Sequence, residues 1–365
     1  MARGPAGRGR VLVTGHAGYL GSVLLPRLLA AGWRVEGLDS GLFADCGFAP
    51  AGRGPTVPAR RMDLRDIKPE QLRGLHCVLH LAGLSNDPLG DMCPILTDRI
   101  NRQATIDLAI AARAAGVERF IFASSCSNYG NAGDELLDEE APLRPLTLYG
   151  RSKVAAEAAL SQLSETGFAV TSLRLATAYG LSPFLRFDLV VNNLVAWASA
   201  EGRVFLKSDG SPWRPIVHVE DIAGAFLAAL EAPARQVAGK VWNVVPPGEN
   251  YRVSELAALV AAAVPGAEIV HAADAGPDRR NYRVSGRRIA CELPGWHPRW
   301  TAAQGVADLA RCLTKARPPA SEFEGSRYQR VAHLVRQQHL GLLDGQLRPA
   351  ASTPKGEESA GLATA

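Results

Sequence analysis

The chain has 365 residues, of which 47% are hydrophobic and 21% are charged, and its formal net charge is +4. This length is sufficient for a large core in two domains, or in one domain with a sizeable lobe. The basic residues are scattered rather than gathered in one block. Composition therefore argues against a nucleic-acid partner and against a membrane-surface partner.

The six cysteines are widely spaced, with no C-x-x-C pair and no Cys/His cluster at metal-binding spacing. This usage is typical of a reducing compartment and argues against structural zinc or a disulfide framework, so we expect no metal site. The apolar run near the start, Val11–Val13, is too short for a signal peptide or a membrane span. We therefore expect a cytoplasmic protein.

Residues 11–130 alternate short apolar strands with alanine-rich helices. We predict strands at Val11–Thr14, Trp33–Asp39, Val78–Ala82 and Phe120–Ser124, and helices at Gly21–Ala31 and Asn101–Ala115. A helix from Ser152 to Ser164 and a strand at Ala169–Leu175 follow. Strand–helix alternation predicts an α/β fold, a Rossmann-type doubly wound parallel sheet with helices on both faces.

The character of the sequence changes after Gly180, where loops separate helices near 190–200, 220–231 and 253–263. We assign residues 10–180 to a nucleotide-binding domain and residues 181–315 to a smaller C-terminal substrate-binding lobe, and leave open whether the chain crosses back. Residues 316–347 are predicted to be a helical extension because 319–345 has an amphipathic pattern. The polar composition of residues 348–365 predicts a disordered tail.

A glycine-rich turn follows the first predicted strand and opens the first predicted helix. Gly15, Gly18 and Gly21 have the spacing G-x-x-G-x-x-G. Glycines at such a turn let the backbone approach a pyrophosphate, and the helix N-terminus stabilises the phosphate charge. Alone this signal is weak, because strand–helix turns without a ligand are also rich in glycine.

Two carboxylates follow at positions suited to a dinucleotide. Asp39 ends the second predicted strand, where a carboxylate binds the adenosine ribose hydroxyls and favours NAD over NADP. The alternative is a solvated turn residue in Asp39-Ser40-Gly41. Asp63-Leu64 is a candidate adenine contact, and a surface turn is the alternative there.

The strongest chemical signal combines Ser124-Ser125 with Tyr149 and Lys153. Tyrosine and lysine four residues apart share one helix face, and an ammonium beside a phenol lowers the phenol pKa. Such a tyrosine can take a proton from a sugar hydroxyl, assisted by a serine at a neighbouring strand end. A Y-x-x-x-K pattern alone is common by chance, but here it follows a nucleotide-binding turn in register.

These motifs resemble the extended short-chain dehydrogenase/reductase family, specifically its NAD-dependent nucleotide-sugar epimerases and dehydratases. The matching segments are VLVTGHAGYLGS (11–22), LDS (38–40), DLRD (63–66), LHLAG (79–83), Asn101, FASSCSNYG (122–130), YGRSK (149–153), LRLATAYG (173–180), DGSPWRPIVHVEDIA (209–223) and GPDRRNYRVSGRRIACELPGW (276–296). They occur in family order, and their combination is highly specific.

The resemblance implies roles for individual residues. The implied NAD contacts are Gly15, Gly18, Tyr19, Leu20, Gly21, Asp39, Asp63, Leu64, Leu81, Ala82, Gly83 and Lys153. The implied catalytic set is Ser125, Tyr149 and Lys153, with Ser125 preferred to Ser124 because it lies four residues before the Tyr129-Gly130 pair. The implied substrate contacts are Ser85, Asp87, Asn193, Arg214 and Arg280, the last chosen from Arg279/Arg280. Surface or turn roles are the alternatives for this last group.

Three positions depart from the family pattern. Related 4,6-dehydratases carry acidic residues just after the catalytic Ser/Thr, where this chain has Cys126 and Ser127, so dehydration loses support. Cys126 is either an acid/base thiol or, as we prefer, a small buried side chain. Lys207 occupies a position near which many relatives have an aromatic residue that stacks on the base, and Phe205 is a candidate substitute.

The leading hypothesis is therefore a nucleotide-sugar epimerase acting at C4 through a transient 4-keto sugar, with internal recycling of NAD. The alternatives within the enzyme class are a 4,6-dehydratase, a uronate decarboxylase and a 4-ketoreductase. A non-catalytic NAD-binding regulator is disfavoured because Ser125, Tyr149 and Lys153 are all present. The resemblance also implies a homodimer formed through the helices after Asn101 and after Tyr149.

Overall fold

A parallel sheet forms the centre of the computed structural model, which describes residues 8–85, 87–276 and 280–350. Its strands are β1 (Arg10–Thr14), β2 (Arg34–Asp39), β3 (Ala59–Arg61), β4 (Cys77–His80), β5 (Arg119–Ser125), β7 (Ala169–Leu175) and β11 (Lys240–Val244). Within the described residues they lie in the order β11-β7-β5-β4-β1-β2-β3, and every pair is parallel. The strand order reverses between β1 and β4, which confirms the predicted doubly wound Rossmann-type fold.

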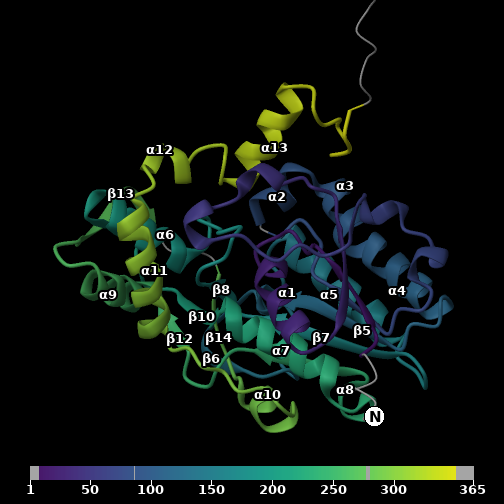
Figure 1. Cartoon of the computed structure of the whole chain (residues 1–365). Helices are drawn as coiled ribbons and strands as arrows, with labels where there is room; N and C mark the ends of the chain where they lie inside the picture. Colours follow the sequence, from purple (N-terminus) through teal and green to yellow (C-terminus); the bar gives the residue numbers. More distant parts are fainter. Residues whose placement is uncertain (1–7, 86, 277–279, 351–365) are drawn as a thin grey trace, which may run out of the picture.

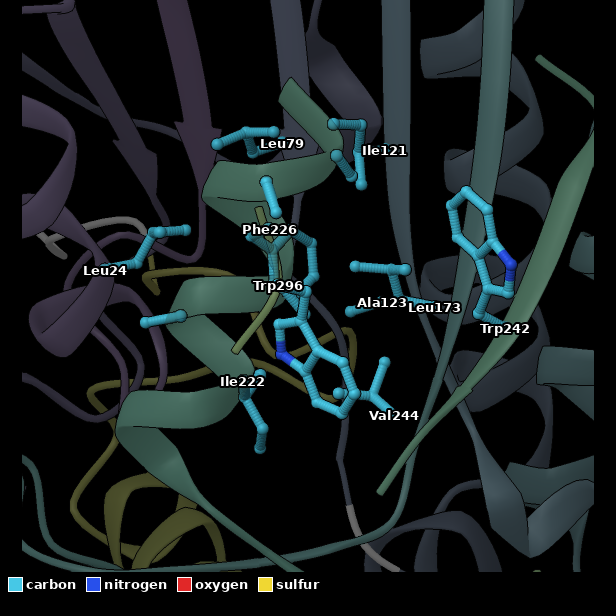
Figure 2. Packing of buried hydrophobic residues seen from close by; sticks show 14 of the residues in the cluster. Leu24, Leu79, Ile121, Ala123, Leu173, Ile222, Phe226, Trp242, Val244 and Trp296 are labelled. Carbon is cyan, nitrogen blue, oxygen red and sulfur yellow. The ribbon is translucent and has the colours of Figure 1, made fainter. Parts of the chain in front are cut away.

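Helices cover both faces of this sheet. Two of them, α1 (Gly21–Ala30) and α7 (Val219–Glu231), pack on one face, where Leu24 and Phe226 meet Leu79, Ile121 and Leu173 (Figure 2). On the other face, α4 (Ala104–Ala114) and α5 (Leu148–Ser161) cover a second buried cluster. Because both faces are covered, the central strands are apolar at nearly every position rather than at alternate ones.

A second region with its own core lies beside the sheet (Figure 1). Its strands are β8 (Thr177–Tyr179), β9 (Arg203–Ser208), β10 (Trp213–His218), β12 (Asn250–Arg252) and β13 (Glu268–Gly276). They form the sheets β12-β10-β8 and β13-β9 among the described residues. The helices α6 (Val190–Glu201), α9 (Val253–Ala263) and α11 (Ala302–Ala316) pack together around the buried side chains of Val195, Leu256 and Leu309.

The chain passes between the two regions more than once. After β10 it returns to the nucleotide-binding sheet, where α7 packs on α1 and β11 pairs with β7. It then leaves again through β12 and α9. Earlier in the chain, β6 (Asn131–Leu137) also leaves the first region, and it pairs with β14 (Asn281–Val284). Part of the second region is therefore inserted between β7 and β11, and the rest of it follows β11, the last strand of the sheet.

Several helices differ from the sequence expectation at their ends. Helix α5 begins at Leu148, after the N-cap Thr147, so Tyr149 lies in its first turn rather than before it. A π-helical turn at Asp98–Gln103 precedes α4. Residues 319–345, predicted to be helical and amphipathic, form two short helices, α12 (Ala320–Phe323) and α13 (Arg330–His339).

The remaining α-helices of the described residues are short: α2 (Asp87–Met92), α3 (Pro94–Thr97), α8 (Ala234–Val237) and α10 (Arg287–Glu292). None of the helices in the described ranges has both the length and the apolar character needed to cross a bilayer. Of the tail predicted to be disordered, residues 351–365 lie outside the described residues.

Candidate active site

A cavity of about 880 Å³ opens at the carboxyl ends of β4, β5 and β7, between the sheet and the second region. This edge is where open α/β sheets bind their ligands. The predicted residues that line it are Tyr19, Leu20, Leu81, Gly83, Ser85, Asp87, Ser125, Tyr149, Lys153, Asn193, Arg214 and Arg280. The fold thus collects in one cavity residues that are far apart in the sequence.

The glycine-rich turn between β1 and α1 borders this cavity. Gly15 has φ +71, and a Cβ there would lie 2.9 Å from the backbone nitrogen of Ala82. A Cβ at Gly21 would collide with the Gly15 carbonyl oxygen. Only glycine fits these positions, so the turn keeps its backbone N–H groups close to the surface, as a dinucleotide pyrophosphate requires. The residues present therefore fit NAD.

Asp39 lies against the same turn. Its Oδ2 accepts a hydrogen bond from the Ala17 backbone nitrogen at 3.3 Å, and its Oδ1 accepts one from Gly41 at 2.8 Å. This carboxylate is therefore part of the turn rather than a solvated side chain. The predicted cofactor residues that do not line the described cavity are Gly15, Gly18, Gly21, Asp39, Asp63, Leu64 and Ala82.

Asp63 is engaged by a neighbouring cation. Its Oδ1 accepts hydrogen bonds from the backbone nitrogen and the Nε of Arg65, at 2.9 and 2.8 Å. Burial raises the pKa of the Asp63 carboxyl, but the hydrogen bonds from Arg65 outweigh burial and hold this pKa below its ordinary value. An adenine contact by Asp63 stays a prediction.

The predicted catalytic residues come together from β5 and α5. Ser125 ends β5, and its Oγ accepts a hydrogen bond from Ser127 Oγ at 2.9 Å. Burial raises the pKa of Tyr149 to about 12, while its hydrogen bond with Ser125 and the positive charge of Arg186 lower it. Ser125 and Tyr149 are thus paired around one point in the cavity.

Lys153 follows Tyr149 on the same face of α5. Its Nζ donates to the Ala123 carbonyl oxygen at 2.8 Å and lies 5.8 Å from the centre of the Tyr149 ring. Burial lowers the pKa of Lys153 to about 7. In this structure the ammonium is directed to the backbone of β5, and the cation that acts on Tyr149 is Arg186.

Ser124 and Cys126 are directed into the protein interior. The Ser124 hydroxyl donates to Glu157 Oε2 at 2.7 Å, and Glu157 forms a buried ion pair with Arg174. Cys126 is 0% exposed, and its Sγ donates to the Arg174 carbonyl oxygen at 3.2 Å. Burial raises the pKa of the Cys126 thiol. These contacts favour Ser125 over Ser124 as the catalytic serine and a packing role for Cys126.

The predicted substrate contacts form a chain of polar groups on the opposite wall. Arg280 donates to Asp87 Oδ2 at 2.9 Å, and the Arg280 carbonyl oxygen accepts a hydrogen bond from the buried Arg214. Asn193 donates to the Phe187 carbonyl oxygen and to Glu324, each at 2.9 Å. Arg279 lies outside the described residues.

Phe205 and Lys207 both line this wall. Phe205 lies 5.1 Å from the Trp197 ring, measured between ring centres. Lys207 forms an ion pair with Glu324 at 2.7 Å. An aromatic surface is therefore present where the sequence analysis considered Phe205 as a substitute for the aromatic residue of many relatives.

Residues that sequence reasoning did not assign also line the cavity. Arg186 donates to Ser85 Oγ at 2.9 Å and to Asp188 at 2.7 Å, and it is 8% exposed. Gln329, Arg330 and Val331 reach the cavity from the C-terminal extension. No local motif marks them, because their position depends on long-range packing. Among the described residues no group of three or more His, Cys, Asp or Glu side chains is arranged to hold a metal ion.

Comparison with known proteins agrees with this site. The family model for the NAD dependent epimerase/dehydratase family matches residues 11–244. The chain belongs to this family. It is 32% identical over 313 residues to the UDP-glucose 4-epimerase of Mycolicibacterium smegmatis, covering 82% of this chain and 96% of that one. The enzyme is therefore NAD-dependent, as the sequence predicted.

Solved structures of family members have the same fold. MoeE5 in complex with UDP-glucuronic acid and NAD superposes with a TM-score of 0.72 at 29% identity, over 84% of this chain and 100% of that chain. The UDP-glucose 4-epimerase of Thermus thermophilus in complex with NAD gives 0.69 at 28% identity, over 84% and 99%. A dTDP-glucose 4,6-dehydratase of Streptomyces venezuelae gives 0.72 at 26%, over 84% and 98%. The family thus includes both epimerases and dehydratases on this fold.

Proposed function

We propose that the protein inverts the C4 hydroxyl group of a nucleotide-linked neutral hexose. The observation that carries this proposal is that Ser125, Tyr149 and Lys153 line one cavity. The two positions that are acidic in related dehydratases are here Cys126, which is buried, and Ser127. Epimerisation needs one group that removes and returns a proton, and Tyr149 suits that task. The relatives named UDP-glucose 4-epimerase make uridine diphosphate hexoses the first substrates to test.

The chain's own residues perform the proton transfer. Tyr149, acting as the phenolate, takes the proton of the C4 hydroxyl and becomes the neutral phenol, and Ser125 donates a hydrogen bond to the same oxygen. Bound NAD supplies the hydride acceptor at C4 and afterwards the hydride donor. Tyr149 then returns its proton to the C4 oxygen after the sugar has turned its other face. Lys153 holds the end of β5 through a hydrogen bond from its Nζ to the Ala123 carbonyl oxygen, and Arg186 is the cation that lowers the pKa of Tyr149.

Elimination of water is disfavoured by the carboxylates of the cavity. Among the described residues that line it, the carboxylates are Asp87 and Asp188. Each forms an ion pair with an arginine, Asp87 with Arg280 and Asp188 with Arg186. A proton removed from C5 would have to reach a carboxylate oxygen that already faces an arginine. We therefore place Asp87 in contact with sugar hydroxyls rather than in elimination.

Decarboxylation of a uronic acid is disfavoured by the state of Arg186. All three nitrogens of its guanidinium already donate, Nε and one terminal nitrogen to Asp188 and the other terminal nitrogen to Ser85. A C6 carboxylate would have to displace Asp188 from Arg186, which breaks a buried ion pair and is costly. This arrangement supports a neutral sugar.

The test is incubation of the purified protein with nucleotide-linked hexoses, amino sugars and uronic acids on several bases, followed by mass-resolved chromatography. We expect a new peak of unchanged mass from a neutral hexose, without added NADH. A product lighter by water or by carbon dioxide would overturn the proposal. A reaction that requires added NAD(P)H and yields a heavier product would make the protein a ketoreductase.

We also propose a homodimer in the cytoplasm. On the outer surface of α4 and α5, Ala114 and Ala158 are exposed and the side chain of Ile110 is 44% exposed. Small and apolar residues at these positions leave room for a second copy of the chain. Light scattering after size exclusion tests this proposal: we expect a dimer that Ile110→Asp converts to monomer, and a monomeric unaltered protein would contradict it.

A further inference from the structure

The C-terminal segment of residues 320–350, which we call the strap, carries α12 and α13 (Figure 1) and contributes Gln329, Arg330 and Val331 to the cavity wall. At its start, Glu324 accepts hydrogen bonds from Asn193 and Trp197, both at 2.9 Å. Near its end, Arg348 donates to Asp66 at 2.8 Å, three residues beyond the predicted adenine contact Asp63. The strap therefore spans the distance from the substrate wall to the adenosine end of the cofactor site.

The strap is packed rather than loosely attached. Phe323 is 0% exposed and stacks on Phe187 at 5.7 Å between ring centres. Leu334 is also 0% exposed and belongs to a cluster that includes Leu84 and Leu89, next to the catalytic cavity. Burial of such side chains stabilises the docked position of the strap. The strap thus belongs to the folded core of the site.

Arg330, the first residue of α13, is the charged residue of the strap that lines the cavity. It is 7% exposed, lines the cavity and lies 3.8 Å from the centre of the Phe43 ring. Within the described part of the chain its guanidinium has no hydrogen-bond acceptor and no ion-pair partner at contact distance. The pKa of Arg330 is lowered to about 10. Burial is the main cause and the charge of Arg186 adds to it, whereas the carboxylates Asp188 and Asp39 act in the opposite sense.

A buried guanidinium without an anion is costly, and proteins rarely keep one unless a ligand supplies the negative charge. The guanidinium fork is suited to phosphate oxygens. Arg330 interacts electrostatically with Asp39, at the adenosine end of the site, and with Arg186, which acts on Tyr149 at the reacting end. The diphosphate of a dinucleotide joins its adenosine to its nicotinamide ribose, and therefore lies between these two ends of the site.

We propose that Arg330 binds the diphosphate of NAD, and that the strap is the outer wall of the cofactor site. The Phe43 ring packs against the guanidinium, and the glycine-rich turn supplies the other contacts of the same diphosphate. Arg214 and Arg280 remain for the diphosphate of the sugar nucleotide. This inference rests on NAD binding by the family and is independent of which sugar reaction the enzyme performs.

The test compares Arg330→Met with Arg330→Lys and with Arg336→Met, an exposed arginine of the same helix that does not line the cavity. NAD retained after purification is measured by chromatography of the denatured protein, and Kd values for NAD, ADP-ribose and UDP are measured by calorimetry on stripped protein. We expect Arg330→Met to weaken NAD and ADP-ribose about 10–100-fold and to leave UDP unchanged. We expect an intermediate loss for Arg330→Lys and none for Arg336→Met.

Two outcomes would overturn the proposal: unchanged NAD affinity in Arg330→Met, or a loss confined to UDP, which would assign Arg330 to the sugar nucleotide. If Arg330→Met does not fold, Phe43→Leu decides, because it keeps the charge and removes only the supporting ring. We expect a several-fold weaker NAD affinity for Phe43→Leu, and an unchanged affinity would reject the proposal. Because these readouts are binding constants, they are independent of the epimerisation assay.

Discussion

Two polar clusters lie at the end of β5, and they differ in whether their groups are satisfied. On one side Ser124 and Glu157 join Arg174, whose guanidinium also donates to Tyr129 at 2.9 Å. On the other side Ser125, Tyr149 and Lys153 face the cavity. Successive residues of a strand point to opposite faces, so adjacent serines serve different purposes. The closed cluster holds the strands together, whereas the open cluster keeps its groups for a ligand.

Replacing Tyr149 by Phe gives the largest expected effect on the open cluster. Because the proton acceptor is removed, we expect turnover to fall by about 10²–10⁴-fold. The melting temperature and the NAD content are expected to stay unchanged, since the ring still fills its place. Turnover is measured on the best substrate of the panel. A variant with normal turnover would favour a different acid/base group, and a protein without any turnover but with a ligand response would favour a regulator.

Replacing Arg174 by Met probes the closed cluster. The change leaves Glu157 buried without its cation, so we expect the free energy of unfolding to fall by about 3–5 kcal/mol in urea titrations. The double variant Arg174→Met with Glu157→Met removes both charges and is expected to recover much of that loss. A single variant as stable as the unaltered protein would show that this ion pair does not hold the strands.

The adjacent serines make a matched pair of variants. We expect Ser125→Ala to lower kcat about 10–100-fold with normal stability, because it removes a hydrogen bond to the reacting oxygen. We expect Ser124→Ala to keep kcat within a few-fold and to lower the free energy of unfolding by about 1–2 kcal/mol. Steady-state kinetics and urea titrations on both variants separate the two roles. A reversed pattern would exchange the two serines.

The pH dependence of stability sharpens the comparison through Lys153. Burial lowers its pKa to about 7 in the folded state, from 10.5 in the unfolded chain. Between these two pKa values the unfolded chain binds more protons than the folded chain, so the contribution of Lys153 to the free energy of unfolding rises with pH. Below pH 7 the folded protein bears the full cost of burying the charged ammonium. We expect stripped Lys153→Met to be more stable than the unaltered protein at pH 6, by about 1–3 kcal/mol, with a smaller difference at pH 9.

Urea titrations at the two pH values check this expectation, with Lys315→Met, on an exposed part of α11, as the control. We expect the control to show the same small difference at both pH values. A Lys153→Met variant that is less stable at pH 6 would mean that the contacts of the ammonium with Ala123 and Phe122 outweigh the cost of its burial.

Much of the first region could be predicted because its signals are local. The β1–α1 turn, the order of strands up to β7 and the spacing from Tyr149 to Lys153 each depend on a few neighbouring residues. At the end of β5 the choice of Ser125 over Ser124 rested on one spacing, four residues before Tyr129, and the structure adds the hydrogen bond of Ser124 to Glu157. The break between α12 and α13 escaped prediction although Gly325 marks it: a Cβ there would collide with the Ser321 carbonyl oxygen.

The sequence by itself determined the doubly wound sheet, the family and the candidate residues for NAD binding and proton transfer. Glycine spacing and helical periodicity depend only on residues that are close together in the sequence. Only the tertiary structure decided that Arg186 lies by Tyr149, that Cys126 is sealed from the cavity, and that Arg330 reaches the cavity from the C-terminal strap. These positions depend on contacts between segments far apart in the chain, and no local pattern encodes which distant surfaces a buried charge will meet.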